Sequence, residues 1–216
     1  MSNIANLKKL EEDDFDIFGK NYSKNITSTN KFEYMPKIYT IKFWHEFDHD
    51  SSLYNSYFEL LEKAREEDTI IFYFNSPGGS VTTLNLFINA LRRCKSKTII
   101  ARVNYAASAA ALLALFCDNI EFDTNATLML HDFYTVEHGK SQNIEASFNH
   151  TKKEIHGLMK LICKKVLSEE EIKDMLNGKD FYFNGEEVII RLKKYANKLM
   201  KELEQKKNSK SKTGKK

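Results

Sequence analysis

This sequence is poor in cysteine, proline and glycine. Its 216 residues contain three cysteines, two prolines and eight glycines. Cys94, Cys117 and Cys163 are odd in number and far apart, so they predict neither a disulfide framework nor a zinc finger. We expect a reducing compartment, no metal and no other cofactor. A hydrophobic share of 42% is enough for a packed core and excludes a wholly disordered chain.

Long apolar runs are also missing. The longest nearly apolar stretch, residues 106–117, includes a serine and is well short of the about 20 residues of a membrane-spanning helix. The N-terminal segment has no apolar core of the kind found in a signal peptide. We therefore expect a cytoplasmic protein without a membrane partner.

Positive charge is concentrated at one end of the chain. The formal net charge is +3, and residues 206–216 contain six lysines and no acidic residue. Without these six lysines the formal charge is −3, which argues against a nucleic-acid-binding face on the domain itself. We expect a partly disordered polar arm over 1–36, one domain over 37–205 and a disordered basic tail over 206–216. A solvated tail is one interpretation, and contact with nucleic acid or an acidic partner is the other.

The hydrophobic pattern alternates between strands and helices. Short apolar runs predict strands at 37–43, 69–74, 97–103, 119–122 and 127–131. Helical periodicity predicts helices at 51–67, 81–94, 107–116 and 141–166, and two capping boxes, beginning at Ser168 and Asn184, predict two more. This alternation is typical of an α/β fold with a largely parallel sheet.

Two adjacent glycines follow the second predicted strand. Gly78 and Gly79 allow positive φ angles and expose peptide N–H groups just before a helix that begins near Val81. The positive end of the helix dipole would favour an oxyanion or a phosphate there. An ordinary tight turn is the alternative interpretation.

A serine and a histidine follow the next two strand regions. Ser108 stands among alanines where a helix begins, so substrate could approach its hydroxyl closely, and the N–H of Ala109 could act as an oxyanion donor. A helix N-cap is the alternative role for Ser108. His131 follows an apolar strand, where a histidine is well placed for catalysis, although a structural role is the alternative.

Together these motifs resemble a known family. Ser-Pro-Gly-Gly at 76–79, Ala-Ala-Ser at 106–108 and Met-Leu-His at 129–131 are similar, in order and spacing, to ClpP, the proteolytic subunit of the Clp protease. The resemblance covers about residues 39–189. It implies a ClpP/crotonase-like α/β fold with repeated β-β-α units, a largely parallel sheet and a long handle helix over 141–166.

The resemblance also implies a function and a set of site residues. It implies a serine endopeptidase that self-associates into rings, takes peptides or unfolded proteins as substrates and works with a Clp-type ATPase. Ser108 would be the nucleophile and His131 the general base, with the N–H groups of Gly79 and Ala109 forming the oxyanion hole. Asp180, before Phe181, matches the family's triad acid, and Asp174 is the nearest rival.

The sequence departs from the family in the segment that should line the substrate groove. Asp132 and Phe133 follow His131, and residues 134–141 contain a single glycine where the family is glycine-rich. Such divergence would suit a phage-encoded relative, including the proteases that mature capsids. The same divergence would also suit a catalytically impaired scaffold subunit, and the fold would also suit a crotonase-like acyl-thioester enzyme.

Overall fold

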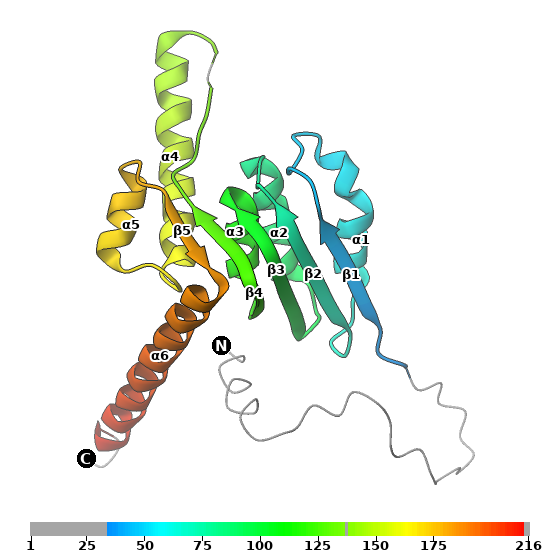
Figure 1. Cartoon of the computed structure of the whole chain (residues 1–216), viewed down its shortest axis with the longest axis vertical. Coiled ribbons are helices and arrows are strands. Elements are labelled where there is room, and N and C mark those ends of the chain that lie inside the picture. The colour runs from blue at the N-terminus through cyan, green and yellow to red at the C-terminus, as the bar shows by residue number, and fades with distance from the viewer. Residues whose placement is uncertain (1–33, 137, 214–216) are drawn as a thin grey trace. The chain divides into compact units, whose positions relative to one another are not determined.

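A computed structural model describes residues 34–136 and 138–213 (Figure 1). The chain divides into two units between Pro36 and Lys37, and the helices and strands of the described residues belong to the second. The predicted polar arm therefore lies almost wholly outside the described residues. No helix in the described ranges is both long enough and apolar enough to cross a membrane.

A five-stranded sheet organises the domain, with the strands in the order β1-β2-β3-β4-β5. The strands are β1 (Ile38–Phe43), β2 (Thr69–Ser76), β3 (Thr98–Ala107), β4 (Asn119–Leu130) and β5 (Phe181–Asn184). Strands β1 to β4 run parallel, and β5 pairs antiparallel with β4. The predicted largely parallel sheet is confirmed.

Helices connect the strands and follow the last one. They are α1 (Asn55–Lys63), preceded by a 3-10 helix at Ser51–Tyr54, α2 (Val81–Arg93), α3 (Ser108–Phe116), α4 (Ser141–Cys163), α5 (Glu169–Leu176) and α6 (Gly185–Thr213). Helices α1, α2 and α3 lie side by side and cover one face of the sheet (Figure 1). The other face carries half-buried or exposed polar side chains, among them Tyr73, Arg102 and Glu121.

An aromatic cluster fills the core between β1, β2 and α2. The ring of Phe43 stacks on Phe72 and Phe74, with centroids 5.6 and 5.2 Å apart, and meets the edge of Phe87 at 5.0 Å. All four side chains are at most 3% exposed. The buried residues of β1 alternate with exposed ones, whereas β2 is buried along most of its length, which is why β2 reads as the more apolar run.

Several elements differ from the sequence-based prediction. The regions 119–122 and 127–131 form one continuous strand, β4, because its pairing with β3 shifts register between Val103 and Tyr105 and then resumes. The short strand β5 was not predicted, because its four residues pair with Thr127–Leu130, more than 50 positions earlier. Helix α4 ends at Cys163, slightly before the predicted end at 166.

Helix α6 extends into the lysine-rich segment. It continues to Thr213 and so includes most of the region 206–216 for which the sequence predicted disorder. Lysine has a high helix propensity, and no proline or glycine interrupts the chain between Gly185 and Gly214. These residues therefore continue the helix that begins inside the domain.

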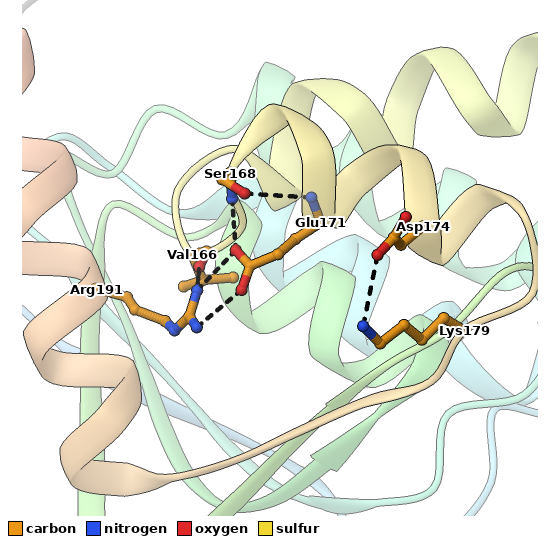
Figure 2. Close-up of polar contacts among 6 residues, drawn as sticks. All are labelled: Val166, Ser168, Glu171, Asp174, Lys179 and Arg191. Carbon is orange, nitrogen blue, oxygen red and sulfur yellow. Dashed lines mark hydrogen bonds and ion pairs between the residues drawn. The ribbon is translucent and has the colours of Figure 1, made fainter.

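Helices α5 and α6 are tied together by a cluster of charged groups. The guanidinium of Arg191 donates two hydrogen bonds of 2.9 Å to the carboxylate of Glu171 and a third to the carbonyl of Val166 (Figure 2). Glu171 also accepts from the backbone N–H of Ser168, which confirms the predicted capping box. These bonds lower the pKa of Glu171 to about 2.

The lowered pKa of Glu171 predicts an acid-dependent contribution to stability. Ionised Glu171 stabilises the fold, so its contribution is complete above the unfolded-state pKa of 4.5 and is lost as the pH falls towards about 2. We expect Glu171→Gln to lower the free energy of unfolding at pH 7 by about 1–2 kcal/mol. This difference should shrink between pH 5 and pH 2 in urea titrations.

The neighbouring Glu170 provides the matched control. It is exposed in the same first turn of α5, so Glu170→Gln should change stability by less than about 0.5 kcal/mol at any pH. A Glu171→Gln effect that stays constant from pH 7 to pH 2 would contradict the assignment.

Candidate active site

The predicted site residues that follow β2, β3 and β4 lie at the same edge of the sheet. Strands β2 and β3 stay paired up to Ser76 and Ala106, and β3 and β4 stay paired up to Ala107 and Met129. Because these strands are parallel, the residues that follow them gather at the carboxyl edge of the sheet. This is where ligands bind in many α/β folds.

Ser108 lies at a sharp turn that joins β3 directly to α3. Its φ is +54°, and it is the one non-glycine residue with a positive φ among the described residues. The serine is half-buried, whereas Ala109, Ala110 and Ala111 are at most 2% exposed. A left-handed serine is a strained conformation, costing on the order of 1–3 kcal/mol, of the kind that clusters at functional sites.

The alternative role of Ser108 as a helix N-cap is wrong. Ala107 occupies the N-cap position of α3, with no capping side chain, and Ser108 is the first helical residue. Its hydroxyl is therefore not used to cap the helix.

The turn after β2 packs against the turn that carries Ser108. Gly78 has a φ of +96°, and a Cβ atom there would lie 2.5 Å from the Ala107 carbonyl oxygen and 2.9 Å from Ser108 Cβ. Gly79 has a φ of +126°, and its Cβ would lie 2.5 Å from the carbonyl oxygen of Phe47. Both positions therefore require glycine, on conformational and on steric grounds.

Backbone donors are available on both sides of Ser108. The N–H of Gly78 donates to Ser76 Oγ, and that of Ser80 donates to the Phe47 carbonyl. Between them, the N–H of Gly79 has no acceptor among the described residues. Ala109 lies in the first turn of α3, where N–H groups have no acceptor within the helix. These two peptide groups can donate to an anionic oxygen.

One cavity collects most of the predicted site residues. It has a volume of about 1090 Å³, and Ser108, Ala109, Gly79 and His131 line it. Helix α4 supplies much of the opposite wall, including Ile155. Four residues predicted from separate motifs thus face a common space large enough for a peptide segment.

Asp180 does not line this cavity. It is exposed and immediately precedes β5, whose first residue Phe181 is paired with Leu130, the last residue of β4. One further step in this antiparallel register brings Asp180 opposite His131. Directly opposed residues in antiparallel strands have Cβ atoms about 4.5–5.5 Å apart, which is within reach of a side-chain contact.

Two other carboxylates have partners of their own. Asp174, the rival for the third triad position, lies 3.4 Å from the ammonium of Lys179 (Figure 2). Asp132, next to His131, accepts a hydrogen bond from the N–H of Phe133 and lies 2.9 Å from Nε2 of His156. Of the three acids, Asp180 is the one that the β4–β5 register, continued by one residue, would place opposite His131.

The three triad candidates are not hydrogen-bonded to one another. No hydrogen bond joins Ser108, His131 and Asp180 in the part of the chain that the structure describes. Catalytic hydrogen bonds in unliganded enzymes are often long and shorten only when substrate is bound.

The cysteines do not offer an alternative nucleophile. Burial raises the pKa of Cys117 and of Cys163 to about 12, and it also raises the pKa of Cys94. A thiol is nucleophilic as the thiolate, so these cysteines are inert at neutral pH.

The sequence contains one metal-binding pattern that the sequence-based prediction did not consider. Residues 45–49, His-Glu-Phe-Asp-His, match the H-E-x-x-H pattern of zinc peptidases, which requires a helix to bring both histidines to one face. The structure has no helix here: the segment is irregular and lies between β1 and the 3-10 helix. Within the described ranges, no group of three or more His, Cys, Asp or Glu side chains could hold a metal ion.

The contact between the two turns predicts an unequal effect of alanine at two glycines. Gly78 and Gly178 have nearly the same φ, +96° and +98°, but nothing lies within 4 Å of a Cβ at Gly178. We expect Gly178→Ala to lower the free energy of unfolding by about 1 kcal/mol and Gly78→Ala by about 2–4 kcal/mol. Urea denaturation of both variants measures the difference, and equal losses would contradict the packing argument.

Comparison with known proteins agrees with this geometry. A family model described as Clp protease matches residues 27–190, about three quarters of the chain. No match was found among curated proteins. The matched region includes the turn after β2, Ser108, His131 and Asp180, and the mixed α/β fold is the one that the resemblance implied. The chain belongs to the Clp protease family.

Proposed function

We propose that this protein is a serine endopeptidase in which Ser108, His131 and Asp180 form the catalytic triad. The observation that carries the proposal is the strained turn at Ser108, in a cavity shared with His131 and between two backbone donors. A left-handed serine with no capping role has no evident structural purpose at this position. The antiparallel register of β4 and β5 supports Asp180 as the third member.

The proposed reaction follows the serine-protease scheme. Ser108 Oγ attacks the scissile carbonyl carbon as His131 removes the hydroxyl proton, and the carbonyl oxygen becomes an oxyanion. The N–H groups of Gly79 and Ala109 donate to that oxyanion. His131 then protonates the leaving amine, and a water molecule hydrolyses the acyl-enzyme by the same steps. Asp180 orients the imidazole and stabilises its protonated form.

Substitution of Ser108 tests the proposal. Ser108→Ala removes a single oxygen, so we expect the fold to be retained and kcat for peptide hydrolysis to fall by about 10³-fold or more. A fluorophosphonate probe should label the parent protein and not the variant. The exposed Ser52, which does not line the cavity, provides the control, because Ser52→Ala should leave both labelling and hydrolysis unchanged.

The same experiment separates serine peptidase activity from the competing functions. A parent protein that is folded but is neither labelled nor active would favour an impaired scaffold subunit. Labelling that persists in Ser108→Ala would contradict the choice of nucleophile. Acyl-thioester turnover without dependence on Ser108 would favour crotonase-like chemistry.

Ring assembly is part of the proposal, and α4 is the element that supports it. The C-terminal half of α4 is buried in its own domain through Ile155, Met159 and Ile162. Its N-terminal half projects past the sheet, where Ile144 and Phe148 are half-buried and most neighbouring residues are exposed (Figure 1). A projecting helix with an apolar stripe suits contact with another subunit, and members of the Clp protease family generally form rings.

Two charge substitutions on α4 should therefore have opposite outcomes. Ile144→Glu should dissociate the assembly and leave a folded protomer, because a buried unpaired carboxylate costs several kcal/mol at an interface. Ile155→Glu should unfold the protein. Ala146→Glu adds the same charge at an exposed site and is the control. Sedimentation and circular dichroism report both outcomes, and an intact assembly with Ile144→Glu would contradict the placement.

A further inference from the structure

The segment that carries His131 is fixed at one end only by strand pairing. Leu130 is the last residue of β4 and pairs with Phe181, whereas residues 131–136 belong to no helix or strand. The position of the His131 imidazole therefore depends on whatever holds the residues that follow it.

Asp132 and Phe133 attach this segment to α4. One oxygen of the Asp132 carboxylate accepts the N–H of Phe133 at 2.8 Å and lies 2.9 Å from Nε2 of His156 on α4. A carboxylate only accepts hydrogen bonds, so the Nε2–H of His156 is the donor. The two side chains are 25% and 14% exposed, so they are partly shielded from water.

Aromatic packing reinforces the same attachment. The Phe133 ring meets the imidazole of His156 edge-on, with centroids 5.7 Å apart, and lies 6.1 Å from the ring of Phe148. Both partners are on α4, and the same helix lines the cavity opposite Ser108. One hydrogen bond and two ring contacts therefore attach the segment after β4 to this helix.

From this geometry we infer that Asp132 and His156 form a positioning pair that holds the His131 imidazole in register with Ser108. The inference rests on the proposed peptidase function. Neither residue lines the cavity that holds Ser108. They act through the peptide bond between residues 131 and 132, and displacement of a catalytic group by 1 Å can cost about 10²-fold in rate.

Variants that remove the hydrogen bond but keep the shape around it test the pair. His156→Phe preserves an aromatic ring against Phe133, and Asp132→Ala removes the acceptor. We expect each to lower kcat for peptide hydrolysis by about 10–100-fold while KM changes less than about threefold. Asp132→Asn keeps a carbonyl acceptor for both donors, so it should retain at least half of the parent kcat.

The double variant tests whether Asp132 and His156 affect kcat through the same hydrogen bond. Because each single change breaks the same bond, Asp132→Ala with His156→Phe should be no slower than the slower single variant. Glu59→Ala, which breaks an exposed ion pair with Lys63 on α1, is the control and should leave kcat unchanged. Circular dichroism and thermal melting establish that each variant is folded, and the two single variants provide independent tests if one is not.

Each outcome is decisive, and failure of the pair can be told from failure of the proposed function. A parent protein without phosphonate labelling or hydrolysis refutes the peptidase and with it the inference. An active parent whose kcat is unaffected by either change overturns the pair alone. A rise in KM at constant kcat assigns the two residues to substrate binding and overturns positioning. Independent, multiplicative losses in the double variant, or an Asp132→Asn protein as slow as Asp132→Ala, also overturn it.

Discussion

The backbone of Gly78 lies against the turn that carries Ser108 so closely that no side chain could fit between them. This contact sets the distance between the exits of β2 and β3, and hence between the N–H of Gly79 and the region around Ser108. It also explains why both strands turn so abruptly into helices. α2 begins at Val81 and α3 begins at Ser108 itself, so two helix N-termini point at one cavity. The positive ends of both helix dipoles favour negative charge there.

Helix α4 is the second element on which the site depends, and it has two halves with different surroundings. Its C-terminal half packs through Ile155, Met159 and Cys163, each at most 6% exposed, and is part of the core. Its N-terminal half is mostly exposed and meets its own domain through the ring of Phe148, which lies against Phe133. The cavity wall and the attachment of the segment after β4 both lie on this helix, so anything that moves the free half acts on residues close to His131.

Much of the fold could be predicted because its determinants are local. The strands carry short runs of apolar or alternating residues, and the capping boxes at Ser168 and Asn184 mark helix starts within four residues. Strand β5 could not be predicted, because four residues are too few to show the two-residue period of a strand. Its partners in β4 are also distant in sequence. The continuity of β4 depends on a register shift relative to β3, which a pattern within one strand cannot show.

Part of the candidate site could also be predicted, because several of its residues directly follow strands that the sequence predicts. Gly79, Ser108 and His131 each follow a strand, which makes them candidates, and the cavity that they share follows from parallel pairing. Choosing them over structural roles required the family resemblance. Asp180 could be chosen only through the family resemblance, and its relation to His131 follows from the β4–β5 register. The hydrogen bond between Asp132 and His156 joins residues 24 positions apart, so no local sequence pattern predicts it.

The left-handed backbone of Ser108 has a consequence for how this chain can change over generations. Glycine adopts that conformation without strain, so replacing Ser108 by glycine would relieve on the order of 1 kcal/mol or more at this turn. In a chain that no longer needed the hydroxyl, a change from serine to glycine at position 108 would stabilise the fold and would cost no function. Selection for stability and selection for the serine oxygen are opposed at this position, and the residue present is the one that stability alone disfavours.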